Sequence, residues 1–176
     1  HEQAVVDTRL RDWFTGDARR AIEWTAGILK PEYQSRIGDL TYLHVTSSLT
    51  AAHGSPDQPE EYRYLFSFED ARPSFKAFET SLCFVGHTHV PSIFTESSES
   101  ASYLPPGSYR LKKEERYILN PGSVGQPRDQ DPRLAFGIFD DEAWTFELVR
   151  LKYDNQKAAS KIREAGLPLF LAARLF

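Results

Sequence analysis

The sequence of 176 residues has one cysteine and no methionine. A single thiol cannot form a disulfide within the chain, which excludes the disulfide-stapled class of small secreted domains and fits a reducing compartment such as the cytoplasm. Cys83 lies inside an apolar run, so we expect it to fill the core rather than act as a nucleophile. Because translation begins with methionine and this sequence begins with His1, we expect a processed or N-terminally incomplete chain.

Long apolar runs and an excess of basic residues are also absent. No segment approaches the roughly 20 apolar residues that span a bilayer, and no signal peptide is visible, so we expect no membrane partner. The formal net charge of −4 gives no basic surface for a nucleic-acid polymer. Hydrophobic residues make up 40% of the chain, enough for a real core, and residues 1–176 are expected to form one domain.

Helical spacing and helix-start signals alternate with short apolar runs along the chain. Helices are expected over residues 8–14, 18–29 (with Asp17 as N-cap), 31–43 (with Pro31 at its start), 70–80 and 154–165, with a helical turn from Pro168. Strands are expected over residues 45–52, 82–85 and 116–119, with an antiparallel hairpin over 134–139 and 144–151. Residues 95–109 are rich in Ser, Glu, Pro and Gly and are expected to form an exposed loop or a loose hairpin tip. The pattern predicts an α/β to α+β fold.

The most informative stretch is Leu82–Pro91, in which four apolar residues precede Gly86-His87-Thr88-His89. Gly86 is expected to supply a sharp turn after a buried strand. Imidazole is the commonest metal ligand at neutral pH, and a loop at a strand end can direct two such rings at one place. The His-x-His pattern alone also fits an ordinary surface loop, so other residues must support a metal site.

Residues 45–52 form another apolar run, and a further histidine follows it. His53 comes directly after residues 45–52 and is followed by Gly54-Ser55-Pro56. His44 is the alternative, because it also follows apolar residues, but it can be interpreted as the end of the preceding helix. We favour His53 as the histidine of this part of the site. The aromatic residues that follow it, Tyr62, Tyr64 and Phe66, are expected to pack, with Tyr62 near enough in sequence to line a pocket.

Taken in order, these motifs resemble the calcineurin-like metallophosphoesterases, in particular the small bacterial phosphodiesterase and phosphatase branch. Gly86-His87-Thr88-His89 is similar to the family's Gly-His-x-His, and His53-Gly54-Ser55-Pro56 to its His-Gly-Ser-Pro segment. His1-Glu2 resembles the end of its Gly-Asn-His-Asp/Glu motif, and the similarity continues through residues 120–129, 153–154 and 165–168. The resemblance implies a four-layer α/β sandwich, two mixed β-sheets flanked by helices, of which this chain holds the C-terminal portion.

The resemblance also implies an activity and a set of site residues. Family members hydrolyse phosphate esters with two divalent ions bridged by a hydroxide and a shared aspartate; here manganese is expected first, with iron, zinc or nickel as alternatives. His53 and His87 would bind one ion and His89 the other. His1 would match the histidine that protonates the leaving group or steadies charge beside it. The expected substrate is a small phosphodiester or nucleotide.

Residues 120–129 have two interpretations. The glycines of Asn120-Pro121-Gly122-Ser123 permit closely stacked turns, which favours structural support beside the site. Exposed amides in such turns also bind phosphate, and on that interpretation Arg128 and Asn120 are candidate substrate-binding residues.

The sequence departs from the family pattern in one respect. The Asp-x-His, Gly-Asp and Gly-Asn motifs, which would supply the bridging carboxylate and most ligands of the first ion, are absent. A companion chain or a segment outside this sequence would have to carry them. Two alternatives stay open: a non-catalytic fragment with a partial metal site, and a zinc-binding module that uses His53, His87 and His89.

Overall fold

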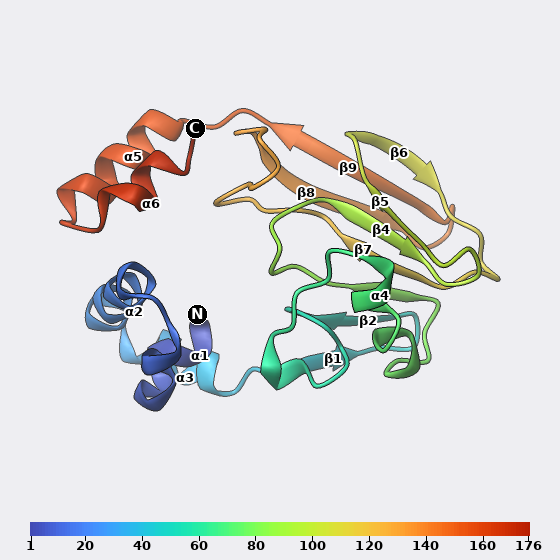
Figure 1. Cartoon of the computed structure of the whole chain (residues 1–176), viewed down its shortest axis with the longest axis horizontal. Coiled ribbons are helices and arrows are strands. Elements are labelled where there is room, and N and C mark those ends of the chain that lie inside the picture. The colour runs from blue at the N-terminus through green and yellow to red at the C-terminus, as the bar shows by residue number, and fades with distance from the viewer. The chain divides into compact units, whose positions relative to one another are not determined.

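The computed structural model describes residues 1–176, which form two compact units (Figure 1). The sheet unit comprises Tyr42–Tyr153. The helical unit comprises His1–Thr41 and Asp154–Phe176. None of the helices has both the length and the apolar character needed to cross a bilayer. The single domain expected over residues 1–176 stays a prediction.

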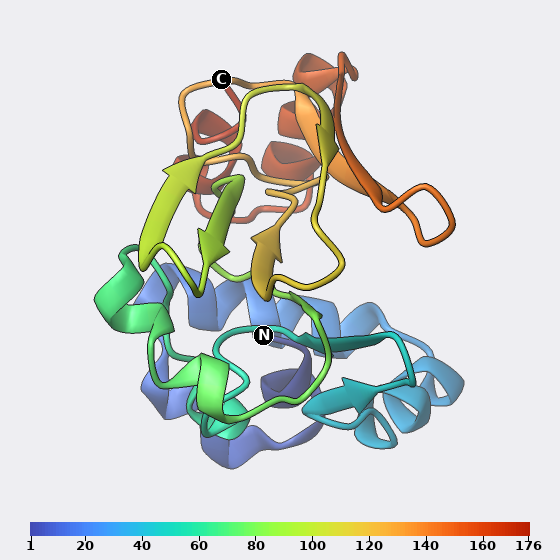
Figure 2. The ribbon, with the colours of Figure 1, turned by 90° about the vertical axis from the view of Figure 1, so that its right-hand side faces the viewer.

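The sheet unit contains a six-stranded mixed sheet with strand order β1-β2-β3-β7-β4-β5. Its strands are β1 (Leu43–Val45), β2 (Leu49–Ala52), β3 (Leu82–Phe84), β7 (Tyr117–Asn120), β4 (Ser92–Thr95) and β5 (Ser100–Tyr103). Strands β2, β3 and β7 are parallel to one another, and the remaining pairs are antiparallel. Figure 2 shows β5, β4 and β7 side by side.

The order of the central strands determines the path of the loop that carries His87 and His89. Strand β7 lies between β3 and β4, although β3 and β4 follow each other in the sequence. The connection from Val85 to Pro91 therefore passes over the end of β7, where Ser92 pairs with Asn120. Both histidines consequently lie at the carboxyl end of the parallel strands, the edge at which sites form in α/β sheets.

The second sheet has three antiparallel strands in the order β6-β9-β8. They are β6 (Gly107–Arg110), β9 (Thr145–Leu151) and β8 (Leu134–Asp140). The register Leu134↔Leu151 to Asp140↔Thr145 confirms the predicted hairpin. The expectation that both sheets are mixed is wrong for this one, because β9 pairs antiparallel with both of its neighbours, β6 and β8.

Two apolar clusters hold the sheet unit together. One lies between the two sheets and contains Leu119 of the large sheet and Phe146 of the small one, both 0% exposed. The other lies on the opposite face of the large sheet, where Phe75 and Phe78 cover Ile118. Each large apolar side chain buried in this way stabilises the fold by about 1.5–3 kcal/mol. This packing keeps the strand ends rigid.

The segment that covers the large sheet differs from the expected helix over 70–80. A capping box between Ser67 and Asp70 starts the helix earlier, so that α4 spans Phe68–Ala71. Pro73 has no N–H to continue it and is followed by the 3-10 turn η3 (Ser74–Lys76). The 3-10 turn η2 (Pro59–Glu61) precedes α4 in the chain.

The helical unit begins with α1 (Glu2–Val6) and the 3-10 helix η1 (Thr8–Trp13), followed by α2 (Gly16–Ile28) and α3 (Pro31–Gly38). Ala4, Val5 and Ile22 form the small core of these helices. Two predictions fail here. Thr15 rather than Asp17 is the N-cap of α2, and α3 ends at Gly38 rather than 43 because residues 43–45 pair with β2 as a strand.

The carboxyl-terminal part of the helical unit contains α5 (Asn155–Glu164) and α6 (Leu169–Ala173). Asp154 caps α5 by accepting a 2.8 Å hydrogen bond from the backbone N–H of Lys157, as predicted. Gly166 has φ +67° where α5 has ended, which also agrees with the sequence pattern. The mixed α/β class with two sheets and flanking helices is confirmed; the four-layer arrangement of the whole chain stays a prediction.

Candidate metal centre

His53 and His87 lie at the ends of two neighbouring parallel strands. His53 follows β2, and His87 comes three residues after β3. The backbone N–H of Gly86 donates a 2.9 Å hydrogen bond to the carbonyl of His53, which joins the two loops. The ring centroids of the two histidines are 5.0 Å apart, at 61°. Two imidazoles are thus held together by a packed sheet.

The backbone of the His-x-His loop is unusual. His87 and His89 both have left-handed conformations, with φ of +64° and +61°. Such values are uncommon outside glycine, and they concentrate at functional sites when the surroundings enforce them. The sharp turn predicted at Gly86 therefore occurs at His87: the N–H of Thr88 donates to the carbonyl of Gly86 over 2.7 Å.

His89 is oriented by a backbone carbonyl from a distant part of the chain. Its Nδ1 lies 2.7 Å from the carbonyl oxygen of Gln126, and since a carbonyl only accepts, Nδ1 carries the proton. The lone pair is then on Nε2, the tautomer suited to metal binding through that atom. The N–H of Arg128 donates to the carbonyl of His89 over 3.2 Å, which fixes the loop from the same side.

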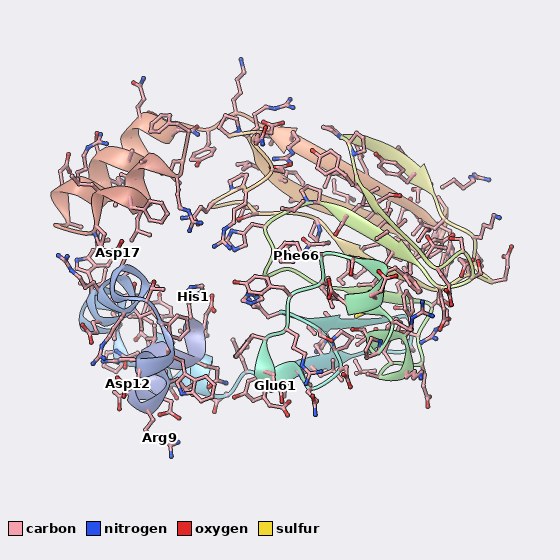
Figure 3. The ribbon with its side chains drawn as sticks, in the orientation of Figure 1. His1, Arg9, Asp12, Asp17, Glu61 and Phe66 are labelled. Carbon is pink, nitrogen blue, oxygen red and sulfur yellow. The ribbon has the colours of Figure 1, made fainter.

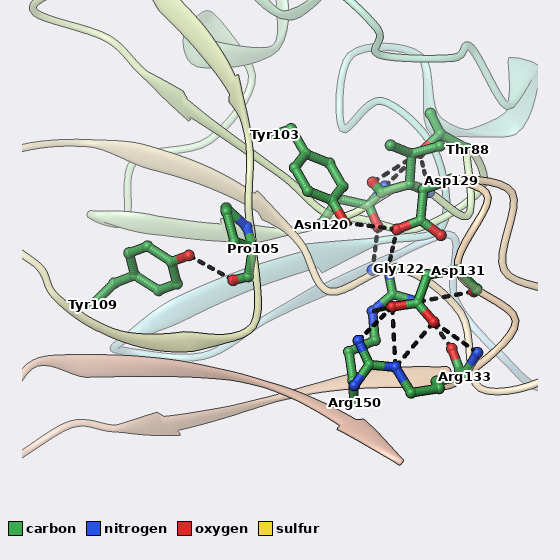
Figure 4. A network of polar contacts seen from close by, with 11 residues as sticks. Thr88, Tyr103, Pro105, Tyr109, Asn120, Gly122, Asp129, Asp131, Arg133 and Arg150 are labelled. Atoms are coloured by element: carbon green, nitrogen blue, oxygen red, sulfur yellow. Dashed lines mark hydrogen bonds and ion pairs between the residues drawn. The ribbon is translucent and has the colours of Figure 1, made fainter. Parts of the chain in front are cut away.

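Asn120 supports the histidine loop from beneath (Figure 4). Its side chain is buried, and its Nδ2 donates to the carbonyl of Gly86 and to Oγ1 of Thr88 over 2.7 and 2.9 Å. Its Oδ1 accepts from the N–H of Gly122 over 2.9 Å. These contacts favour the structural interpretation of the Asn120–Asp129 segment. Direct contact of Asn120 with a substrate stays an untested prediction.

Gly122 shows why this segment needs glycine. Its φ is +84°, and an added Cβ would lie 2.8 Å from Cγ of Pro91 and 3.0 Å from Cβ of Ala135. The turn thus passes close under the start of β4. Arg128 places its Nη2 3.3 Å from Oε1 of Gln126, beside the residue that orients His89.

Two aromatic residues contact the histidine pair. Tyr64 stacks on His87 with ring centroids 3.9 Å apart at 18°. Tyr62 meets His53 edge-on at 5.9 Å. We expected Tyr64 to pack, and it does so against His87 while remaining 45% exposed. The alternation of Tyr62, Tyr64 and Phe66 around buried Leu65 was a usable signal, since it places three aromatic rings on one side of an extended segment.

Gly54 allows the aromatic segment to approach the histidines. A Cβ at Gly54 would lie 2.9 Å from the carbonyl oxygen of Arg63 and 3.0 Å from the carbonyl carbon of Tyr62. The N–H of Ser55 donates to that same Arg63 oxygen over 3.1 Å, so the two backbones run in direct contact.

Replacing Gly54 by alanine is therefore expected to displace the Tyr62–Arg63 backbone. We expect a loss of about 1–3 kcal/mol in the free energy of unfolding, measured by urea denaturation, because the added methyl overpacks a backbone contact. Gly27→Ala is the matched control, since nothing lies within 4 Å of a Cβ at that helical position. An equal loss in both variants would contradict the role of Gly54.

Burial and nearby charge keep His87 neutral. The pKa of His87 is lowered to about 4, mainly by burial. Smaller electrostatic contributions come from His53, His89 and Arg128. A neutral imidazole is the form that binds metal, so His87 is available as a ligand at neutral pH. By contrast, Cys83 is 0% exposed, which confirms that it is a core residue, and this burial raises the pKa of its thiol to about 12.

His44 and His1 are the two remaining histidines. His44 is exposed in the middle of β1, opposite Ala51, and not at a helix end. His53 rather than His44 therefore lies beside His87. His1 belongs to the helical unit, where its ring lies 5.3 Å from that of Phe14. Its expected role near the leaving group stays a prediction.

The donor set fits part of a metal site. Three imidazoles lie on two neighbouring loops, one neutral by burial and one with its tautomer fixed. No three His, Cys, Asp or Glu side chains within residues 1–176 are arranged to hold a metal ion. The histidines would thus supply only a share of the ligands of a two-ion centre.

Comparison with known proteins identifies the architecture. No family model matches the sequence. The chain is 34% identical over 181 residues to an uncharacterized protein from Methanocaldococcus jannaschii, a match covering 100% of this chain and 72% of that protein. A hypothetical protein from Pyrococcus horikoshii, 16% identical, has a similar fold with a TM-score of 0.72; the match covers 99% of this chain and 69% of that structure.

A third similar protein is the one that indicates an enzyme family. The crystal structure of a metallophosphoesterase from Sphaerobacter thermophilus matches with a TM-score of 0.89 and 36% identity. The match covers 99% of this chain and 73% of that one, so it includes both strand ends and the loops that carry the histidines. This level of identity over this length shows common descent, and the chain belongs to the metallophosphoesterase family.

Proposed function

We propose that this protein hydrolyses small phosphodiesters or nucleotides with a centre of two divalent metal ions. As a member of the metallophosphoesterase family, the protein is a hydrolase of the phosphoesterase kind that uses divalent metal ions. The main support for a two-ion centre is the His53–His87 pair. Their ring centroids are 5.0 Å apart at the ends of adjacent parallel strands, and His89 is oriented by the Gln126 carbonyl.

The proposal assigns a role to each residue. His53 and His87 would hold one ion and His89 the other, with manganese as the expected metal. When bound, two such ions activate a water molecule and neutralise charge on the phosphoryl group. Arg128 would attract the phosphate through its guanidinium, and Asn120 would hold the loop in place. His1 would give a proton to the leaving oxygen.

The number of ligands leads to a proposal about partners. Two ions would need more donors than three imidazoles supply, and carboxylate oxygens would be suitable additional ligands. We therefore propose that groups beyond these three histidines, on a companion chain or a further segment, complete the centre. A cytoplasmic location stays a prediction; the reduced, buried Cys83 is compatible with it.

Metal removal tests the proposed function. Treating the natural protein, with any subunit that co-purifies, with EDTA is expected to reduce hydrolysis of bis(p-nitrophenyl) phosphate to background, and Mn²⁺ should restore it. Elemental analysis after desalting should find two ions per chain. Undiminished hydrolysis after complete chelation would contradict the proposal, and a single tetrahedral zinc without hydrolysis would favour a zinc-binding module.

A further inference from the structure

Three aromatic rings form one continuous stack that starts at the metal-site histidine. Tyr64 lies against His87 with centroids 3.9 Å apart at 18°, and Phe66 lies against Tyr64 at 5.4 Å and 12°. The 5.4 Å separation exceeds face-to-face contact between two parallel rings, so Phe66 is slid sideways and leaves part of the outer face of Tyr64 uncovered.

The two outer rings are exposed, in contrast to the aromatic residues that follow them. Phe66 is 65% exposed and Tyr64 45%, whereas Phe68, Phe75 and Phe78 are buried in the core. Phe66, labelled in Figure 3, lies on the segment between Glu61 and α4. A contiguous exposed apolar surface beside a polar site is typical of a binding surface.

The backbone under these rings is fixed. Leu65, between them, is 4% exposed and belongs to the apolar cluster under the large sheet. The N–H of Phe66 donates a 3.1 Å hydrogen bond to the Asp70 carboxylate, which also closes the capping box of α4. Ser55 holds the other end through the Arg63 carbonyl. The rings are therefore preorganised, which lowers the entropy cost of binding a ligand.

The position of the stack beside the histidines indicates which kind of ligand would bind there. A phosphate held at the histidines leaves its organic group to extend over the adjoining surface, and here that surface is aromatic. Flat rings stack on such surfaces with favourable energy, and nucleobases do so regardless of sequence. We propose that Tyr64 and Phe66 form a stacking platform for the base of a nucleotide whose phosphate lies at the histidine site, an inference that rests on the proposed function.

Titration with AMP and with ribose 5-phosphate, followed by NMR in the presence of Mg²⁺ rather than paramagnetic Mn²⁺, tests the platform. AMP should bind at least about fivefold more tightly than ribose 5-phosphate and shift the ring signals of Tyr64 and Phe66. Phe66→Leu should remove most of this preference without altering a direct contact of His87. Tyr64→Leu should also remove it, although this change takes away the ring that stacks on His87. Ile138→Ala, which removes an exposed apolar side chain from the small sheet, should leave it unchanged.

The outcomes separate the platform from the proposed function. Hydrolysis of bis(p-nitrophenyl) phosphate with Mn²⁺ is measured on the same preparations. If hydrolysis is present and AMP binds no better than ribose 5-phosphate, the platform is overturned while the function stands; the same holds if another part of the protein covers both rings. If AMP is preferred through Phe66 but no ester is hydrolysed, the platform stands and the proposed function fails.

Discussion

Replacing His87 by alanine is expected to abolish manganese-dependent hydrolysis of an aryl phosphodiester. His87 is half-buried, is kept neutral by a pKa of about 4, and lies 5.0 Å from His53 between ring centroids. Removing it takes away a ligand and also the surface on which Tyr64 stacks. Because groups that only orient a ligand cost 10–100-fold when removed, we expect a loss of at least about 100-fold in kcat/KM.

Two controls separate the lost imidazole from the altered backbone. His87 has φ +64°, where alanine is strained, so His87→Ala is also expected to lower the melting temperature. His87→Asn tolerates that conformation better and should lose activity with less change in stability. His44→Ala, which removes an exposed histidine from β1, should leave hydrolysis unchanged. Unchanged activity in His87→Ala would contradict the proposed metal centre.

Replacing Arg150 by methionine is expected to destabilise the sheet unit by about 3–5 kcal/mol, because one member of a buried ion pair would lose its partner. The side chains of Arg150 and Asp129 are 1% and 4% exposed and form a direct ion pair (Figure 4). Arg150 also donates to the carbonyl of Arg133 over 2.8 Å, and Tyr103 donates to Asp129 over 2.9 Å. After the substitution, the buried Asp129 carboxylate would keep only the Tyr103 hydroxyl.

Urea denaturation measures this loss, and the chain offers a matched control. Arg133 pairs with Asp131 in the same network, but its side chain is 42% exposed. Arg133→Met should therefore have a much smaller effect. Replacing both members, as Arg150→Met with Asp129→Asn, should recover part of the stability, since no charge remains buried. Equal losses for Arg150→Met and Arg133→Met would show that burial of the pair is unimportant.

The ion pair also bears on the site. Asp129 follows Arg128 directly, and Arg128 is bonded through its backbone to His89, so Arg150 anchors the loop that orients this histidine. In Arg150→Met we accordingly expect weaker metal binding as well as lower stability.

Local patterns predicted the elements that depend on local chemistry. The Asp154 cap, the Pro31 start and the long hairpin were all correct, because caps, proline and alternation act within a few residues. The exposed loop expected over residues 95–109 was wrong for most of its length, because β5 and β6 lie there. The alternative of a hairpin tip fits the turn between β4 and β5. Gly has low strand propensity, and the pairing of β5 with β4 and of β6 with β9 overrides it.

The expected strand over 45–52 was likewise too simple. It is the hairpin β1–β2, turned by Thr46, whose Oγ1 accepts hydrogen bonds from the N–H groups of Ser48 and Leu49. The sequence did place His53 and His87 at strand ends, since apolar runs mark buried strands. The contact of His89 with the Gln126 carbonyl joins two residues that are 37 positions apart in the sequence. Because it uses a backbone atom, no pattern of side chains predicts it.

The insertion of β7 between β3 and β4 has a consequence for when the site can form during translation. Translation produces His53, His87 and His89 before Tyr117–Asn120 exists, yet Asn120 supports the loop over β7. A nascent chain that has not yet reached β7 thus contains all three imidazoles but no scaffold to hold two of them. Competence to bind metal should therefore arise only after the chain through Asn120 has left the ribosome.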